Sequence, residues 1–206
     1  MKYQELQKAI NKPFFSNLDI LLNKLKVYNY QLSLWRKKGY ISRLKKGLYF
    51  FVSEKEKITP QEVSFLIYQP SYLSLETALS YYGLIPEIVY AQTGVTTKTT
   101  RKFSNDFGNF TYRHIHPKLF FGYFPVETFS GKYLIAEAEK ALLDYFYFNL
   151  GKINKEKDIE EMRINYDELE KIIDKKKINS YLKEFDIQKL TSSINNLFEI
   201  CSRFHS

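Results

Sequence analysis

The sequence predicts an α+β fold: a helical unit that ends in a β-hairpin, followed by a mixed α/β domain with a mainly antiparallel sheet and C-terminal helices. Apolar residues recur at helical spacing over the first 40 residues. A period of two, rich in Val, Thr, Tyr and Phe, runs from residue 88 to 128, and helical spacing returns at residue 134. A charged stretch at residues 54–57 separates the two parts, so we expect domains at residues 1–55 and 56–206.

The composition is that of a globular protein. The chain has 206 residues, of which 44% are hydrophobic and 26% are charged. Its single cysteine, Cys201, excludes an intramolecular disulfide, which fits a reducing cytoplasm. The first residues carry charges without an apolar signal-peptide core, and no apolar run is long enough to cross a bilayer. We therefore expect a cytoplasmic protein without a membrane partner.

Two short helices are expected before residue 28. Tyr3, Leu6 and Ile10 recur at helical spacing, and Ser16 followed by Asp19 is the pattern of a capping box. The second helix is expected to face the core with an apolar stripe formed by Leu18, Leu21, Leu22 and Leu25.

A third helix is predicted over residues 30–38. Asn29 is its expected N-cap, and Gly39 is placed to end it. Leu32 and Trp35 lie three residues apart, so both should face inward and anchor this helix to the first two.

A hairpin should follow, with strands at residues 40–44 and 47–51 and a turn that contains Lys45, Lys46 and Gly47. Two helices, a basic helix and a basic hairpin, in this order, predict a winged helix-turn-helix. The third helix would enter the major groove of DNA, and the hairpin would be the wing.

The positive charge of the chain is concentrated in this unit. Residues 20–53 contain no acidic residue and eight basic ones, which equals the net charge of +8 for the whole protein. Such a face predicts a polyanionic partner, here double-stranded DNA; a solvated basic face without a partner is the alternative. Basic side chains would hold phosphates, and Gln31 and Ser33 would read base edges. The predicted DNA-binding residues are Tyr30, Gln31, Ser33, Arg36, Lys37, Lys38, Arg43, Lys45 and Lys46.

The second part should open with two helices. Residues 59–62 have a capping Thr, then Pro and a Glu three positions after the cap, and Pro70 should end that helix. Residues 74–82 form the next helix, which Gly83 ends. Strands are expected at residues 89–97, 102–104, 109–116 and 119–128, with a hairpin turn at 105–108, and helices at 134–150, 167–174, 178–185 and 187–204.

Three groups of side chains could carry chemistry. His114 and His116 could be half of a metal site, but the chain offers no third ligand at a useful spacing, so ordinary histidines are favoured. The segment 93–101 (TGVTTKTTR) could contact phosphates or could be an exposed strand edge. Four charged residues cluster on a predicted helix, where surface ion pairs or a cap contact from Glu139 explain them better than a metal-dependent nuclease: Glu137, Glu139, Lys140 and Asp144.

The sequence gives no reason to expect an enzyme. It contains no Gly-rich phosphate loop, no Gly-x-Ser-x-Gly elbow and no Cys/His pair at catalytic spacing. We therefore expect no catalytic residue, no cofactor and no metal.

Five short strings, in order along residues 15–200, resemble the AbiEi family, the antitoxins of type IV toxin–antitoxin (abortive infection) systems. The strings are residues 43–49 (RLKKGLY), 70–79 (PSYLSLETAL) with 82–87 (YGLIPE), 95–101 with 112–115, 136–144 (AEAEKALLD) and 162–165 (MRIN).

The resemblance implies a phage-defence function. An N-terminal winged helix would bind the protein's own operator and repress its operon, and the C-terminal domain would supply antitoxin activity. The toxin would be similar to nucleotidyltransferases and would be countered without a stable complex. The alternative is a stand-alone winged-helix transcriptional regulator whose second domain senses or assembles.

Overall fold

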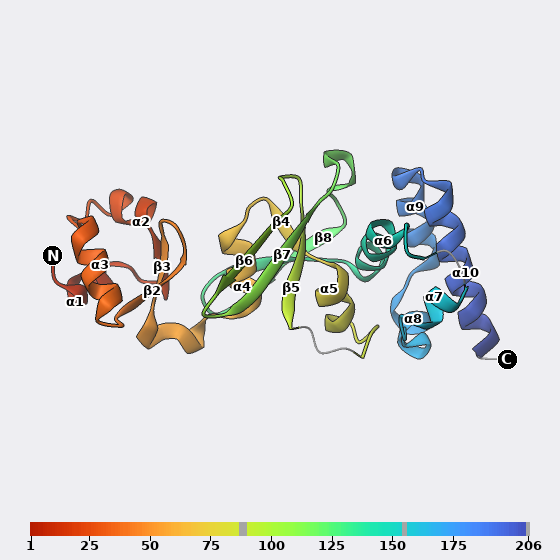
Figure 1. Cartoon of the computed structure of the whole chain (residues 1–206), viewed down its shortest axis with the longest axis horizontal. Coiled ribbons are helices and arrows are strands. Elements are labelled where there is room, and N and C mark those ends of the chain that lie inside the picture. Colours follow the sequence, from red (N-terminus) through yellow and green to blue (C-terminus); the bar gives the residue numbers. More distant parts are fainter. Residues whose placement is uncertain (87–89, 154–155, 205–206) are drawn as a thin grey trace.

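The chain is arranged as three parts in a row along its longest direction (Figure 1). The computed structural model describes residues 1–86, 90–153 and 156–204. A unit of helices and a hairpin lies at the N-terminal end, a six-stranded sheet lies in the middle, and a group of helices lies at the C-terminal end. The structure is thus α+β, as predicted.

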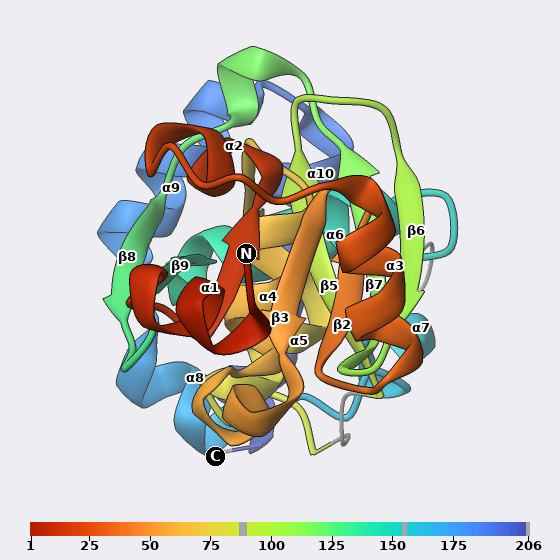
Figure 2. The same cartoon turned by 90° about the vertical axis from the view of Figure 1, so that its left-hand side faces the viewer.

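The N-terminal unit packs three helices on a three-stranded antiparallel sheet with the order β1-β3-β2 (Figure 2). The predicted capping box is confirmed, because the Asp19 amide donates to Ser16 Oγ and the Ser16 amide donates to Asp19 Oδ2. Gly39 and Gly47 have φ values of +71° and +78°, which suits the end of a helix and a tight turn. The elements are α1 Tyr3–Ala9, β1 Phe14–Ser16, α2 Asn17–Leu22, α3 Asn29–Lys37, β2 Ile41–Lys45 and β3 Leu48–Phe51.

One face of this sheet and the three helices enclose a small core. Leu32 and Trp35 are buried in it, as predicted. The predicted leucine stripe of α2 is wrong for three of its four residues: Leu18, Leu21 and Leu22 are 60%, 72% and 69% exposed. Ile20 is the buried residue of the helix, and Leu25, which follows the helix, packs against the core while partly buried. A helix of six residues can turn only a narrow face inward, and the core accepts the Ile20 side.

The central sheet has the strand order β6-β7-β5-β4-β9-β8. The β6–β7, β4–β5 and β8–β9 pairs are antiparallel, and the β5–β7 and β4–β9 pairs are parallel. The sheet is therefore mixed but mainly antiparallel. Its strands are β4 Ser71–Leu73, β5 Ala91–Thr96, β6 Arg101–Asn105, β7 Gly108–His114, β8 Tyr123–Glu127 and β9 Lys132–Ala136.

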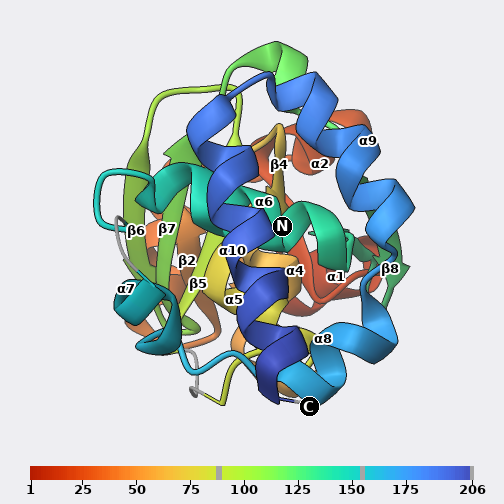
Figure 3. The same ribbon diagram turned by 90° about the vertical axis from the view of Figure 1, so that its right-hand side faces the viewer.

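Helix α6 lies between the central sheet and the C-terminal helices (Figure 3). Its residues Ala141, Leu142, Leu143 and Phe146 are fully buried in the largest core of the protein. The helices of this second part are α4 Pro60–Ile67, α5 Leu75–Tyr81, α6 Ala138–Asn149, α7 Glu156–Glu160, α8 Tyr166–Ile172, α9 Lys175–Phe185 and α10 Gln188–Phe204, with short 3₁₀ helices η1 Val52–Lys57 and η2 Pro117–Leu119.

Several local predictions are confirmed. Thr59 caps α4, with Pro60 at its first position and Glu62 completing the capping box. The β6–β7 turn lies at the predicted residues, since Asn105 pairs with Gly108. Part of the strand predicted at residues 89–97, and residue 87 of one family string, lie outside the described residues; β5 itself begins at Ala91.

Other boundaries need correction. The helix predicted from residue 134 begins at Ala138. The residues before it form strand β9, which pairs with β4 and β8, and the side chains of Tyr133 and Ile135 are buried in the core. The N-cap of α3 is Tyr28, one residue before the predicted Asn29. Strands β1 and β4 have only three residues each, too few for periodicity to predict them.

Candidate nucleic-acid interface

Helix α3 turns a basic and aromatic face outward. Tyr30, Ser33, Arg36, Lys37 and Lys38 are exposed, as the prediction of a DNA-reading helix requires. The helix can expose them because the inward positions between them, Leu32 and Trp35, are buried in the core of the N-terminal unit.

Gln31 lies on the wrong side of α3 for DNA contact. Its side chain is 9% exposed, its Oε1 accepts a hydrogen bond from the Tyr28 amide at 2.9 Å, and its Nε2 donates to the Met1 carbonyl at 2.8 Å. The prediction that Gln31 reads base edges is therefore wrong. Gln31 is the third residue of the helix, where a Gln side chain satisfies the free amide of the N-cap residue.

The three cations of the hairpin differ in their exposure. Arg43 and Lys46 are exposed, and Lys46 occupies the β2–β3 turn beside Gly47. Lys45 is only partly exposed, and its Nζ donates to the Ile67 carbonyl at 2.8 Å. Burial, and after it the charge of Lys98, lower the pKa of the Lys45 ammonium. Lys45 thus forms a hydrogen bond within the protein, whereas the side chains of Arg43 and Lys46 are exposed to solvent.

The cations of the N-terminal unit have no carboxylate partner in the part of the chain that the structure describes. In the described ranges, residues 1–86, 90–153 and 156–204, none of the eight basic residues between Lys24 and Lys46 forms an ion pair with a carboxylate. A folded surface that keeps so many unpaired cations raises a local positive potential, which attracts polyanions.

A second cationic feature lies beside the hairpin. Lys98 and Arg101 flank a hollow of about 800 Å³ that the loop between β5 and β6 forms with Tyr68 and His114. The phenol of Tyr68 donates to the Thr99 carbonyl at 2.8 Å and holds the loop. Lys98 is close enough to Lys45 to affect its pKa. The end of the segment 93–101, for which the sequence leaves both phosphate contact and an exposed strand edge open, is therefore exposed next to the hairpin.

The first half of that segment has a different role. Thr93 Oγ1 donates to the Ser74 carbonyl at 2.9 Å, and Thr96 Oγ1 donates to the Pro70 carbonyl at 2.6 Å. Both acceptors flank β4, so these hydroxyls hold β5 on β4 and are not turned toward a ligand. Within the segment 93–101, only residues 97–101 are available for phosphate contact.

The two histidines do not form a metal site in the described structure. His114 Nδ1 lies 3.0 Å from the Lys98 carbonyl, and His116 Nδ1 accepts a hydrogen bond from the Lys118 amide. His114 is the last residue of β7, whereas His116 lies beyond the strand and precedes η2. In the part of the chain that the structure describes, no three His, Cys, Asp or Glu side chains gather as metal ligands would.

The charged cluster of α6 forms the most deeply buried polar network in the described structure. The Lys140 ammonium pairs with Asp144 and donates to the Tyr72 hydroxyl at 2.8 Å, and both charged side chains are fully buried. The hydroxyls of Tyr72 and Ser74 donate to Asp144 Oδ2 at 2.9 and 2.8 Å. The prediction of surface ion pairs is therefore wrong for Lys140 and Asp144.

Burial sets the electrostatics of this network. It raises the pKa of Asp144 and lowers the pKa of Lys140, because each charged form loses water. The three rings of Tyr72, Phe121 and Phe185 lie 5.1 to 5.4 Å from Lys140 Nζ. A fully enclosed pair with aromatic neighbours joins β4 to α6 and has no surface from which a substrate could reach it.

The other two acids of the cluster contact α9. Glu139 accepts a hydrogen bond from the Asp174 amide at 3.0 Å, and Lys177 lies 3.2 Å from Glu137 and 3.3 Å from Glu139. The expected cap contact of Glu139 is thus present, since Asp174 is the N-cap residue of α9. These contacts fix the C-terminal helices on α6.

Comparison with known proteins does not assign the chain to a family. The chain matches no protein-family model, and no curated protein sequence matches it. None of the helices in the described part of the chain combines the length and apolar character that crossing a bilayer requires.

Proposed function

We propose that the protein binds double-stranded DNA through the outward face of α3 and the turn of the β2–β3 hairpin. The order of the N-terminal unit supports the proposal, because the basic helix α3 is followed directly by the basic β2–β3 hairpin, and the third helix of a winged helix-turn-helix enters the major groove. The observation that carries the proposal is the set of eight cations on this unit without a carboxylate partner in the described residues.

The exposed residues divide into two roles. Tyr30 lies in the first turn of α3, where a recognition helix contacts base edges, and Ser33 lies at the middle of the helix. The cations hold phosphates and so supply affinity rather than sequence preference. The cations that would hold phosphates are Arg36, Lys37, Lys38, Arg43 and Lys46. Lys45 is not among them, and Gln31 is not among the base-reading residues, because both side chains donate hydrogen bonds to backbone carbonyls of the protein.

The charge count gives a measurable expectation. Five cations that each neutralise one phosphate give a plot of log affinity against log salt with a slope of about −4.5. The loop with Lys98 and Arg101 lies beside the hairpin and would make the slope steeper if it reached the same duplex.

We further propose that the DNA is the operator of the protein's own operon and that the protein is the antitoxin of a type IV toxin–antitoxin system. The support is the resemblance of the ordered strings to the AbiEi family. Two of these strings, residues 70–79 and 136–144, contain the four side chains that meet in the buried network. The toxin is expected to be nucleotidyltransferase-like and to be countered without a stable complex.

Two experiments test these proposals separately. Binding of the purified protein to a labelled duplex from its own promoter tests the DNA-binding proposal, with a scrambled duplex as the control. Deletion of the neighbouring gene in the operon tests the antitoxin proposal. If the protein becomes dispensable only in that deletion strain, the antitoxin proposal is supported. If it is dispensable, or required, in both strains, a stand-alone regulator explains it better.

A further inference from the structure

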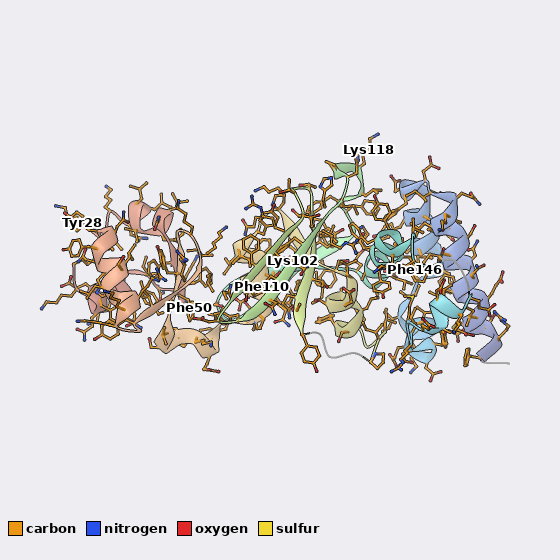
Figure 4. The ribbon with its side chains drawn as sticks, in the orientation of Figure 1. Tyr28, Phe50, Lys102, Phe110, Lys118 and Phe146 are labelled. Atoms are coloured by element: carbon orange, nitrogen blue, oxygen red, sulfur yellow. The ribbon has the colours of Figure 1, made fainter. Side chains whose placement is uncertain are left out.

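The three-stranded sheet of the N-terminal unit is covered on both faces. Phe51 points into the core of the N-terminal helices, and its neighbour Phe50 points the other way, into a core shared with Val63 and Phe110. Phe50 and Phe51 are both almost fully buried. The shared core crosses the domain boundary predicted at residue 55, and Figure 4 shows Phe50 and Phe110 at the junction of the two parts.

A β-bulge in the hairpin is completed from the central sheet. Arg43 pairs with Tyr49 and Lys45 pairs with Leu48, so the ladder skips Leu44. The Leu44 carbonyl instead accepts a hydrogen bond from Asn105 Nδ2 at 3.3 Å. Asn105 lies at the end of β6, so this contact joins the edge of one sheet to the edge of the other.

Lys45 makes the second polar connection. Its ammonium donates to the carbonyl of Ile67, the last residue of α4. The last carbonyls of a helix have no partner within the helix, and they carry the negative end of its dipole. A cation placed there satisfies an acceptor and is electrostatically favoured. The position therefore explains why one of three hairpin cations is turned toward the protein.

We infer that Lys45 is a positioning residue, which together with Asn105 holds the hairpin on α4 and β6 and so sets the direction in which Arg43 and Lys46 project. This inference rests on the proposed function, because the projected cations are its DNA ligands. The second part of the chain would then contribute to DNA binding without contacting DNA, because α4 and the central sheet hold the hairpin in place.

The test compares neutral variants of two adjacent lysines in the full chain. Lys45→Met and Lys46→Met each remove one charge and keep an unbranched side chain, but only Lys45 has the helix-end contact. Amide hydrogen exchange of residues 41–51 should become faster in Lys45→Met and stay at the wild-type rate in Lys46→Met. This readout requires no DNA, so it stands even if the DNA-binding proposal fails.

DNA titrations against salt separate positioning from phosphate contact. Lys46→Met should reduce the magnitude of the slope by about 1. Lys45→Met should weaken binding about three- to tenfold at every salt concentration, which is the range of the net contribution of one typical hydrogen bond, and keep the wild-type slope. A wild-type exchange rate in Lys45→Met, together with a slope reduced as in Lys46→Met, would show that Lys45 is a phosphate ligand and overturn the inference.

A variant on the other side of the junction gives an independent check. Asn105→Ala carries no charge change and lies outside the N-terminal unit, yet it should also speed exchange in the hairpin and weaken DNA binding with an unchanged slope. Asn109→Ala, at an exposed position of β7, is the matched control and should do neither. Equal behaviour of the two asparagine variants would contradict the role given to Asn105.

Discussion

Lys140 and Asp144 form an ion pair across one turn of α6 while both side chains are completely shielded from solvent. Two hydroxyls, from Tyr72 and Ser74, complete the partners of the carboxylate. Removal of one member of a buried pair leaves an uncompensated charge, whereas removal of both can cost far less.

This relationship predicts that Asp144→Ala lowers the free energy of unfolding by about 3–5 kcal/mol. Urea denaturation measures the change. Lys140→Met combined with Asp144→Leu should cost less than Asp144→Ala alone, because no charge remains buried. Lys171→Ala, which removes an exposed ion pair with Glu168, should leave the urea midpoint unchanged. A single variant as stable as the wild type would show that the pair does not hold β4 on α6.

Tyr112 predicts a loss of stability at alkaline pH. Burial raises the pKa of its phenol, whose hydroxyl donates to the Ser64 carbonyl at 2.5 Å. In the unfolded chain the phenol titrates near pH 10. Because the folded pKa is higher, the contribution to stability is complete below about pH 10 and is lost as the pH rises toward the folded pKa.

Tyr112→Phe should therefore be less stable than the wild type at pH 8, by about 1–3 kcal/mol, since Ser64 loses its buried partner. The difference should shrink at pH values above about 10. Ionisation of this phenol then stabilises the unfolded state of the wild type, which lowers the wild type's free energy of unfolding, and the Phe variant has no phenol to ionise. Urea denaturation over a pH series measures it. Tyr90→Phe, at an exposed side chain, is the control. A pH-independent difference for Tyr112→Phe would contradict the assignment.

The orientation of α2 gives a simple test of the N-terminal core. Ile20→Ala should lower the free energy of unfolding by about 2–4 kcal/mol, because it leaves a cavity beneath the helix. Leu21→Ala removes a side chain that is 72% exposed and should have little effect. Thermal denaturation of the two variants distinguishes this orientation from the leucine stripe that periodicity predicts, for which the order of the two effects would be reversed.

One cation of α3 should act only through phosphate contact. Lys37→Ala is expected to reduce the magnitude of the salt slope by about 1 and to weaken binding equally for operator and scrambled duplexes. Its thermal stability should not change, since the side chain is exposed. Lys183→Ala, at an exposed position of α9 at the other end of the molecule, is the control and should leave the slope unchanged.

Local signals predicted the caps and turns of the fold well. The capping boxes at Ser16 and Thr59 and the turns at Gly39 and Gly47 depend on residues close in sequence, so the pattern contains the needed information. The inward positions Leu32 and Trp35 follow from helical spacing for the same reason.

Contacts between distant segments were not predictable in this way. A lysine at position 45 in a basic turn has the sequence pattern of a DNA contact, and only the placement of α4 reveals its partner at Ile67. Lys140 and Asp144 have the spacing of a surface pair, and their burial depends on β4 and α9, which lie far away in the sequence. Gln31 could have been assigned from sequence, because the third position of a helix favours a Gln that caps its own N-terminus.

The most direct test of the central claim is a titration of the full chain against a labelled duplex from its own promoter, repeated at several salt concentrations between about 50 and 300 mM. The account predicts binding that weakens with salt at a slope of about −4.5 or steeper and that is tighter for this duplex than for a scrambled one. Absence of binding at the lowest salt, or a slope near zero, would contradict the claim that the unpaired cations of α3 and the hairpin dock on DNA.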